Sequence, residues 1–256
     1  MKIVVCIKQV PDSTAKVVVE LGKVSWGDAP LIMNPWDEYA LEAALQQKEA
    51  LGGSVTAVSI GDESTKETLK RALAMGADDA ILICDPALGN MDTQATAQIL
   101  ATVIQKSGGV DMAFFGRQAI DGEAGLVPAQ TARLLGWPAL TLASVIKIEG
   151  SNIHVERGVE EGRQIVSAKL PAVFSLTKDF GEPRYPSFMG IRKAARAEIP
   201  TWSLAELGIA APASTIAWPE IMNPPSREVT CEFITGSSPD EIADTLANKI
   251  LAEKVL

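Results

Sequence analysis

Residues 54–84 read SVTAVSIGDESTKETLKRALAMGADDAILIC, and this stretch alone indicates the class of fold. It opens with an apolar run over 54–60 and closes with another over 79–84, and both are as continuous as strands covered on two faces. Between them, the pattern over 63–75 is typical of a helix that ends at Gly76. Two buried strands joined through a helix by short links predict a right-handed crossover and a parallel pair.

The same alternation continues on either side of this unit. Residues 3–10 and 112–115 are further predicted buried strands. A helix begins at Asn34-Pro35, where we expect Asn34 to supply the capping acceptor and Pro35 to take the first helical position. Asp92 is expected to cap another helix. The predicted fold class is therefore α/β, a mostly parallel twisted sheet with helices on both faces.

From about residue 139 the pattern changes to alternating apolar and polar residues between glycine-containing turns. Such segments are typical of antiparallel hairpins, which here would extend the sheet. The predicted antiparallel strands cover 140–149, 152–157, 163–168 and 172–176.

Beyond residue 178 the chain is rich in Pro, Ala and Trp. Its apolar residues are too many for a linker and too irregular for a compact domain, so we expect them to pack against another protein. A strand over 228–234 and a final amphipathic helix beginning at Ser238 are predicted. The pattern thus predicts an α/β domain over 1–190, which includes the antiparallel extension, and a C-terminal arm and helix over 191–256.

The charge and cysteine content exclude several classes of protein. Lysine and arginine total 23 against 32 acidic residues, a net charge of −9, which argues against nucleic-acid binding because it leaves no cationic face. Three widely spaced cysteines and one histidine predict no metal site. No apolar run approaches the roughly 18 residues of a membrane span. An apolar start interrupted by Lys8 is not typical of a signal peptide, so we expect a cytoplasmic protein.

Ligands of open parallel sheets bind beyond the carboxyl ends of the strands, where loops and helix starts converge. Cys6, the segment 34–37, Ile60 and the glycine-rich segment 116–127 (GRQAIDGEAGLV) are all expected at that edge. Glycines let backbone amides approach a ligand, and arginine pairs with phosphate. The candidate binding residues are Cys6, Asn34, Pro35, Trp36, Asp37, Ile60, Gly116, Arg117, Gln118, Ala119, Ile120, Asp121, Gly122, Glu123, Ala124, Gly125, Leu126 and Val127.

The same residues allow a plainer interpretation. Neither GxGxxG nor GxxxxGK[ST] occurs, so an ordinary glycine-containing turn after a strand is the alternative to a ligand site. His154 lies in a hairpin-like segment and is interpreted as a sheet histidine, and Cys6 as a packing residue. Because nothing assembles a nucleophile, a base and oxyanion donors, we predict no catalytic residue.

A second informative segment spans 181–196. Prolines stiffen it, apolar residues stand at its tip and basic residues follow on a short predicted helix. Exposed apolar residues flanked by charge are typical of a docking surface. The alternative is a capped surface helix with a locally buried Phe188. The candidate docking residues are Pro186, Phe188, Met189 and Arg192.

Several motifs together resemble those of one family, in order and spacing along nearly the whole chain: VVCIKQVPD (4–12), NPWDEYALEAAL (34–45), ALAMGADDA (72–80), GRQAIDGEAG (116–125) and LPAVFSLTKDFGEPRYPS (170–187). The chain resembles electron-transfer flavoprotein beta subunits. The resemblance implies an adenine nucleotide alpha hydrolase-like fold and a heterodimer with an alpha subunit that carries the redox FAD.

The resemblance also implies a nucleotide bound by the candidate residues above and a dehydrogenase-recognition loop with Phe188 at its anchoring position. The C-terminal arm would wrap the alpha subunit. The partners would then be the alpha subunit and acyl-CoA or other dehydrogenases.

The sequence departs from the family pattern at two places. Pro128 stands where many relatives have glycine, and KAARAEIP (193–200) replaces a lysine-rich stretch. The second departure favours the bifurcating branch, in which the beta subunit holds a second FAD and accepts electrons from NADH, over the branch that holds AMP. Both nucleotides stay open at this point. The rival interpretation is a free-standing adenine-nucleotide-binding regulator or hydrolase of the same fold.

Overall fold

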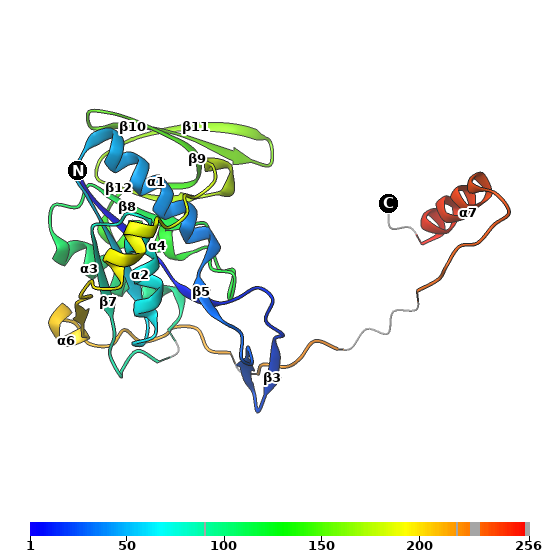
Figure 1. Ribbon diagram of the computed structural model, residues 1–256, viewed down its shortest axis with the longest axis horizontal. Helices are drawn as coiled ribbons and strands as arrows, with labels where there is room; N and C mark the ends of the chain where they lie inside the picture. The colour runs from blue at the N-terminus through cyan, green and yellow to red at the C-terminus, as the bar shows by residue number, and fades with distance from the viewer. Residues whose placement is uncertain (90, 219, 226–230, 254–256) are drawn as a thin grey trace. The chain divides into compact units, whose positions relative to one another are not determined.

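The computed structural model describes residues 1–256 except 90, 219, 226–230 and 254–256. Within these residues, nine strands form one sheet in the order β11-β10-β9-β12-β8-β1-β6-β7-β13 (Figure 1). The central strands are parallel and confirm the predicted fold class: β12 (Ala172–Leu176), β8 (Met112–Gly116), β1 (Lys2–Cys6), β6 (Ser54–Ile60) and β7 (Asp79–Ile83).

Helices cover both faces of the parallel strands. Alternate side chains of β1 divide between two cores, with Ile3 and Val5 in one and Val4 and Cys6 in the other. The first core packs against α1 (Pro35–Leu51) and α2 (Thr65–Met75). The second packs against α3 (Thr93–Ser107), α4 (Val127–Leu135) and α6 (Leu204–Leu207).

The antiparallel extension consists of three strands instead of the predicted four. β9 (Ala139–Glu149), β10 (Asn152–Val159) and β11 (Gly162–Lys169) pair antiparallel, but β12 lies between β8 and β9 and is parallel to both. The prediction for 172–176 was therefore wrong. All five β12 residues are buried, and Phe174 stacks on Phe114 of β8 with the ring centroids 4.8 Å apart. That unbroken apolar run is typical of a strand covered on both faces.

The first strand is shorter than predicted. β1 ends at Cys6, and β2 (Gln9–Pro11) pairs antiparallel with β5 (Leu31–Met33) as a separate ribbon. Between them, β3 (Val18–Glu20) and β4 (Lys23–Ser25) form a hairpin (Figure 1). Its tip residue Leu21 is fully exposed.

The chain on both sides of residue 190 belongs to the α/β body. A 3-10 helix (Lys178–Phe180) leads to α5 (Phe188–Ala194), and β13 (Thr201–Trp202) pairs parallel with β7. Leu204 and Leu207 are buried in the second core. The compact units are accordingly Met1–Ile221 and Met222–Leu256, whereas the sequence pattern had placed the division at 190.

The second unit contains α7 (Pro239–Ala252), which Ser238 caps by accepting a hydrogen bond from the Glu241 amide, as predicted. On this helix Leu246, Ile250 and Leu251 are exposed. The strand predicted over 228–234 falls partly outside the described residues, and 231–234 contain no strand. Among the helices that the structure describes, none has the length and apolar character needed to cross a membrane.

Candidate functional site

The carboxyl ends of β1 and β8 lie side by side, and the start of α1 reaches both of them. Asn34 precedes α1 and is 1% exposed. Its Nδ2 donates to the Gln118 carbonyl (2.8 Å), and its Oδ1 accepts from the Ile120 amide (3.2 Å). The prediction that Asn34 caps α1 was therefore wrong: its side chain makes no cap hydrogen bond and instead holds the loop that follows β8.

Asp37, in the first turn of α1, joins the two strand ends. Its carboxylate accepts hydrogen bonds from the amides of Lys8 (2.7 Å) and Gly116 (3.1 Å). The fit at Gly116 is close: a Cβ there would lie 2.3 Å from the Asp37 Oδ1 and 2.6 Å from the Trp36 carbonyl carbon. Glycine at 116 is thus required by the approach of α1. The guanidinium of Arg117 lies over the Trp36 ring, 5.6 Å from its centroid.

The loop over 116–126 is shaped by its own backbone and by Lys8. The amides of Gly122 and Glu123 donate to the Ala119 carbonyl, and the Lys8 Nζ lies 2.5 Å from the Asp121 Oδ2. Glu123 and Gly125 have positive φ angles of 49° and 63°. Asp121 is therefore held by an ion pair with a residue that follows β1.

Several buried polar atoms near this loop have no partner among the described residues. They are the Asp121 Oδ1, the Gln130 Oε1 and the Thr131 Oγ1, and the Ser59 Oγ near the end of β6 is a fourth. Since buried polar atoms are nearly always hydrogen-bonded, the unpaired Asp121 Oδ1 in this loop is an acceptor open to a donor from outside the chain. Ribose hydroxyls and an adenine amino group are such donors.

The start of α4 completes the arrangement. In the described part of the chain, the amides of Ala124, Gly125 and Leu126 donate no hydrogen bond, and they lead into Val127, the first residue of α4. Free amides at a helix start favour an anion such as a phosphate. Pro128 lies in the first turn, where its missing N–H removes no helical bond. The donor set therefore fits a nucleotide.

The structure brings most of the predicted site residues together. Asn34, Asp37 and the 116–126 loop are directly hydrogen-bonded to one another. Ile60 ends β6 at the same edge of the sheet. Cys6 ends β1 at this edge and is buried, and its burial, followed by the nearby Asp37 charge, raises the pKa of the thiol. Burial favours its interpretation as a packing residue over that as a nucleophile, and its role in binding stays a prediction.

Sequence reasoning missed Ser59, Gln130 and Thr131 as candidate site residues. Each is a polar residue inside a strand or helix. The sequence gives no sign that such a residue does more than form part of that element. Lys8 was noticed only as the charge after the first strand, because nothing in the sequence indicates that it reaches Asp121 over 113 positions.

The pKa of Asp37 gives a pH prediction. Burial raises the pKa to about 7, against the opposing effect of the Lys8 amide, Asn34, the Gly116 amide and the Lys8 charge. Because the native pKa lies above the unfolded value near 4, Asp37 contributes most stability at low pH and loses it as the pH rises to about 7.

We therefore expect the free energy of unfolding of the wild type, minus that of Asp37→Asn, to fall between pH 5 and 7. The slope is at most about 1.4 kcal/mol per pH unit, and the difference is flat above about pH 8. Denaturant unfolding of both proteins across this range measures it. A difference that stays flat between pH 5 and 7 would show that Asp37 is ionised throughout this range, which would contradict the raised pKa.

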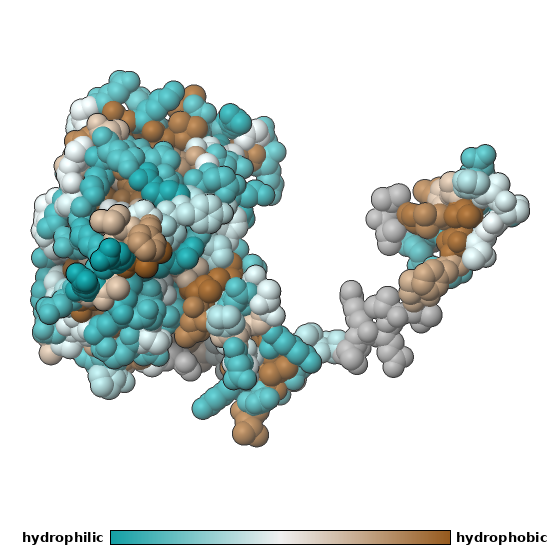
Figure 2. Space-filling view, in the orientation of Figure 1, coloured by the Kyte–Doolittle hydropathy of each residue, from teal (hydrophilic) through white to brown (hydrophobic). Residues whose placement is uncertain are grey.

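The predicted docking segment is exposed at its tip. Phe188 and Met189 are 76% and 72% exposed, which rules out the alternative of a locally buried Phe188. Arg192 is also exposed, and Pro186 is half-buried. Figure 2 shows apolar side chains at the surface where α5, the yellow helix of Figure 1, lies.

Two further predictions concern the remaining candidates. His154 lies on β10, where its Nδ1 pairs with the Ser167 Oγ (2.9 Å), which confirms its interpretation as a sheet histidine. Among the described residues no group of His, Cys, Asp and Glu is arranged to hold a metal ion.

Comparison with known proteins assigns the family. The electron transfer flavoprotein domain model matches residues 26–207. The chain is 37% identical to the electron transfer flavoprotein subunit beta of Megasphaera elsdenii and 37% identical to the caffeyl-CoA reductase-Etf complex subunit CarD of Acetobacterium woodii, in both cases over 100% of each chain. It is also 37% identical to the Bacillus subtilis subunit beta, over 82% of this chain and 81% of that one. The chain therefore belongs to the electron transfer flavoprotein family, among its beta subunits.

Proposed function

We propose that this chain is the beta half of a heterodimeric electron carrier that binds an adenine nucleotide in the 116–126 loop and completes the FAD site of an alpha partner. The observation that carries the proposal is the group of unpaired acceptors of Asp121 and Gln130 beside free amides at the start of α4. That donor and acceptor set suits ribose or adenine at one end and phosphate at the other.

Different residues would contribute to nucleotide binding in different ways. Asn34 and Asp37 hold the loop in shape, so that its amides are oriented before a ligand arrives. Lys8 neutralises one oxygen of Asp121 and leaves the other to accept a hydrogen bond. Bound FAD supplies electron transfer, whereas bound AMP would only stabilise the fold through ligand linkage.

The nucleotide is FAD or AMP, and the residues in the 193–200 stretch favour FAD. Relatives that match include a subunit of a caffeyl-CoA reductase-Etf complex, which supports a role beside a thioester-handling redox enzyme. With a second FAD, NADH oxidation and flavin-based electron bifurcation would be part of the function. The free cysteines Cys6, Cys84 and Cys231 fit the reducing cytoplasm.

The stoichiometry of released nucleotide tests this proposal. The chain is purified with its alpha partner and denatured, and FAD and AMP are counted per heterodimer. Two FAD, or one FAD and one AMP, support the proposal, and they separate the bifurcating form from the simple carrier. One FAD with no second adenine nucleotide contradicts it. A monomer that is stable alone and hydrolyses ATP would establish the rival regulator or hydrolase.

Two sets of exposed apolar residues, at the start of α5 and from residue 218 onward, are proposed to contact protein partners. Phe188 and Met189 with Arg192 would dock dehydrogenases. Trp218, Met222 and Phe233 are 78%, 69% and 84% exposed, and with the apolar residues of α7 they would pack on the alpha partner.

Replacing Phe188 with alanine tests the docking role. We expect the KM for a reduced acyl-CoA dehydrogenase to rise about tenfold, because an exposed aromatic anchor is the usual source of binding energy in an interface. Flavin content should stay unchanged. Stopped-flow reduction of the flavin at varied dehydrogenase concentration measures the KM.

Ile165→Ala is the matched control, since Ile165 is 70% exposed on β11, an edge strand of the sheet, whereas α5 packs on α2. Equal KM values for Phe188→Ala, Ile165→Ala and the wild type would remove the docking role.

A further inference from the structure

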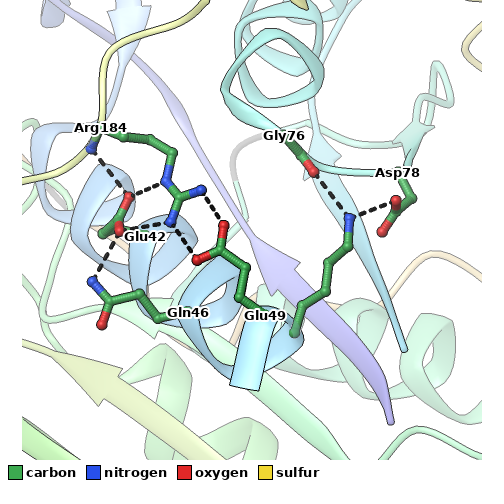
Figure 3. Close-up of polar contacts among 7 residues, drawn as sticks. Glu42, Gln46, Glu49, Gly76, Asp78 and Arg184 are labelled. Atoms are coloured by element: carbon green, nitrogen blue, oxygen red, sulfur yellow. Dashed lines mark hydrogen bonds and ion pairs between the residues drawn. The ribbon is translucent and has the colours of Figure 1, made fainter. Parts of the chain in front are cut away.

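The segment that leads into α5 is fastened to α1 by one arginine. Arg184 spans two carboxylates of α1 (Figure 3). Its Nε and Nη2 donate to the two oxygens of Glu42 at 2.8 and 3.0 Å, and its Nη1 and Nη2 donate to the two oxygens of Glu49 at 2.5 and 3.2 Å. Its backbone amide also donates to Glu42, at 3.1 Å. Both the main chain and the side chain of this residue are therefore held.

This contact differs from an ordinary surface ion pair. The Glu42 side chain is only 6% exposed, and it also accepts from the Gln46 Nε2 at 2.9 Å. Burial alone would raise the pKa of Glu42, but the hydrogen bonds from Arg184 and Gln46 outweigh it and lower the pKa. The carboxylate is thus ionised, desolvated and held in a bidentate pair, the geometry that fixes position most firmly.

The exposed docking tip follows directly from this anchor. Ser187 caps α5 by accepting from the Gly190 amide (2.9 Å), and a Cβ at Gly190 would lie 2.2 Å from the Ala74 carbonyl oxygen of α2. Lys48 of α1 in turn contacts the Asp78 carboxylate (2.6 Å), just beyond the end of α2 (Figure 3). The tip residues therefore stand on a base made of α1 and α2.

One helix connects this base with the nucleotide loop. Asn34 and Asp37 hold the loop at the start of α1, and Glu42 lies on the same helix, roughly 12 Å from Asn34 along the axis at 1.5 Å per residue. A helix packed on a sheet keeps such a spacing fixed. The nucleotide loop and the docking tip are therefore held by the same helix.

We propose that Arg184 is a positioning residue that holds the docking segment in its bound conformation before the dehydrogenase arrives. The proposal rests on the docking role proposed above. A segment that is already ordered loses less conformational entropy on binding than a flexible one, so preorganisation strengthens binding without adding a contact. The bidentate pair with Glu42 also sets where the tip stands relative to α1.

The test uses Arg184→Met in the complex with the alpha partner. We expect the KM for a reduced acyl-CoA dehydrogenase to rise about tenfold, while kcat at saturation and the nucleotide content stay within about twofold of the wild type. Amide hydrogen exchange over 184–191 should become faster in the free complex. Arg184→Lys keeps the positive charge but cannot form the bidentate pair, so its KM should lie between those of the wild type and Arg184→Met.

Arg163→Met is the matched control, because Arg163 is 83% exposed and lies 4.0 Å from its nearest carboxylate on Glu156. A KM for Arg184→Met equal to that of the control overturns the proposal, whether or not exchange becomes faster. Should Arg184→Met fail to assemble, Glu49→Gln removes the outer carboxylate alone and should raise the KM about threefold; no rise would equally count against it.

Phe188→Ala separates this proposal from the one on which it rests. If Phe188→Ala raises the KM and Arg184→Met does not, docking stands and the positioning role is wrong. If Phe188→Ala has no effect, the docking surface itself is wrong, and so is the role of Arg184.

Discussion

Replacing Asn34 with alanine is expected to empty the nucleotide site. The side chain is 1% exposed and holds the loop at both the Gln118 carbonyl and the Ile120 amide. Its loss leaves two backbone groups unpaired, at about 1–3 kcal/mol each, and releases the loop from α1. We expect the adenine nucleotide released per heterodimer to fall from about two to about one, because only the FAD of the alpha partner would remain.

Two variants control this experiment. Asn34→Asp keeps the acceptor for Ile120 but loses the donor to Gln118, so we expect partial occupancy. Asn152→Ala removes an exposed asparagine at the start of β10 and should leave the nucleotide content unchanged. Full occupancy in Asn34→Ala, measured by chromatography of the released nucleotide, would show that the loop does not depend on α1.

Replacing Gly116 with alanine is expected to have the largest effect on stability. The new methyl group would lie 2.3 Å from a buried carboxylate oxygen and 2.6 Å from backbone in the first turn of α1, so it cannot be accommodated by moving a flexible side chain. Either the end of β8 or α1 must shift. We expect a loss of more than about 4 kcal/mol in the free energy of unfolding, measured by denaturant titration, or failure to fold.

Gly122→Ala is the matched control in the same loop. A Cβ at Gly122 would have no neighbour within 4 Å, and its φ angle is not in the left-handed region. We expect its stability to change by less than about 1 kcal/mol. Similar losses in both variants would mean that the loop, and not the contact between Gly116 and α1, limits stability.

The α/β class follows from local patterns that the structure keeps. β6 has the predicted bounds, α2 ends at Gly76, and Asp92 caps α3 by accepting from the Ala95 amide. These features depend on residues only a few positions apart, so they can be predicted from the local sequence. For Phe188 the sequence left two interpretations open, an exposed docking tip and a locally buried side chain, and the structure has the exposed one.

Features that depend on contacts distant in sequence were not predicted. Whether β12 is parallel depends on its position between β8 and β9, which the hairpin alternation before it concealed. Asn34 has the residue type of a helix cap, but the carbonyl and amide it binds lie 84 and 86 positions away. The bond from Arg184 to Glu42 spans 142 positions, and no local pattern indicates it.

The glycines of the loop show the same limit in another way. The sequence left two interpretations open for all of them together, the approach of a ligand or an ordinary turn, but the structure distinguishes one glycine from another. Gly116 makes room for α1, Gly125 adopts a positive φ before α4, and Gly122 has open space around it. The open space at Gly122 would let a ligand approach the backbone there, and this role stays a prediction.

A density map of the purified heterodimer tests the central claim most directly. We expect density for a nucleotide against the 116–126 loop, with phosphate oxygens within hydrogen-bond distance of the amides of Ala124, Gly125 or Leu126. The Asp121 Oδ1 should then have a donor. A loop that is empty in the map, or filled by side chains of either subunit, while the complex still transfers electrons, would contradict it.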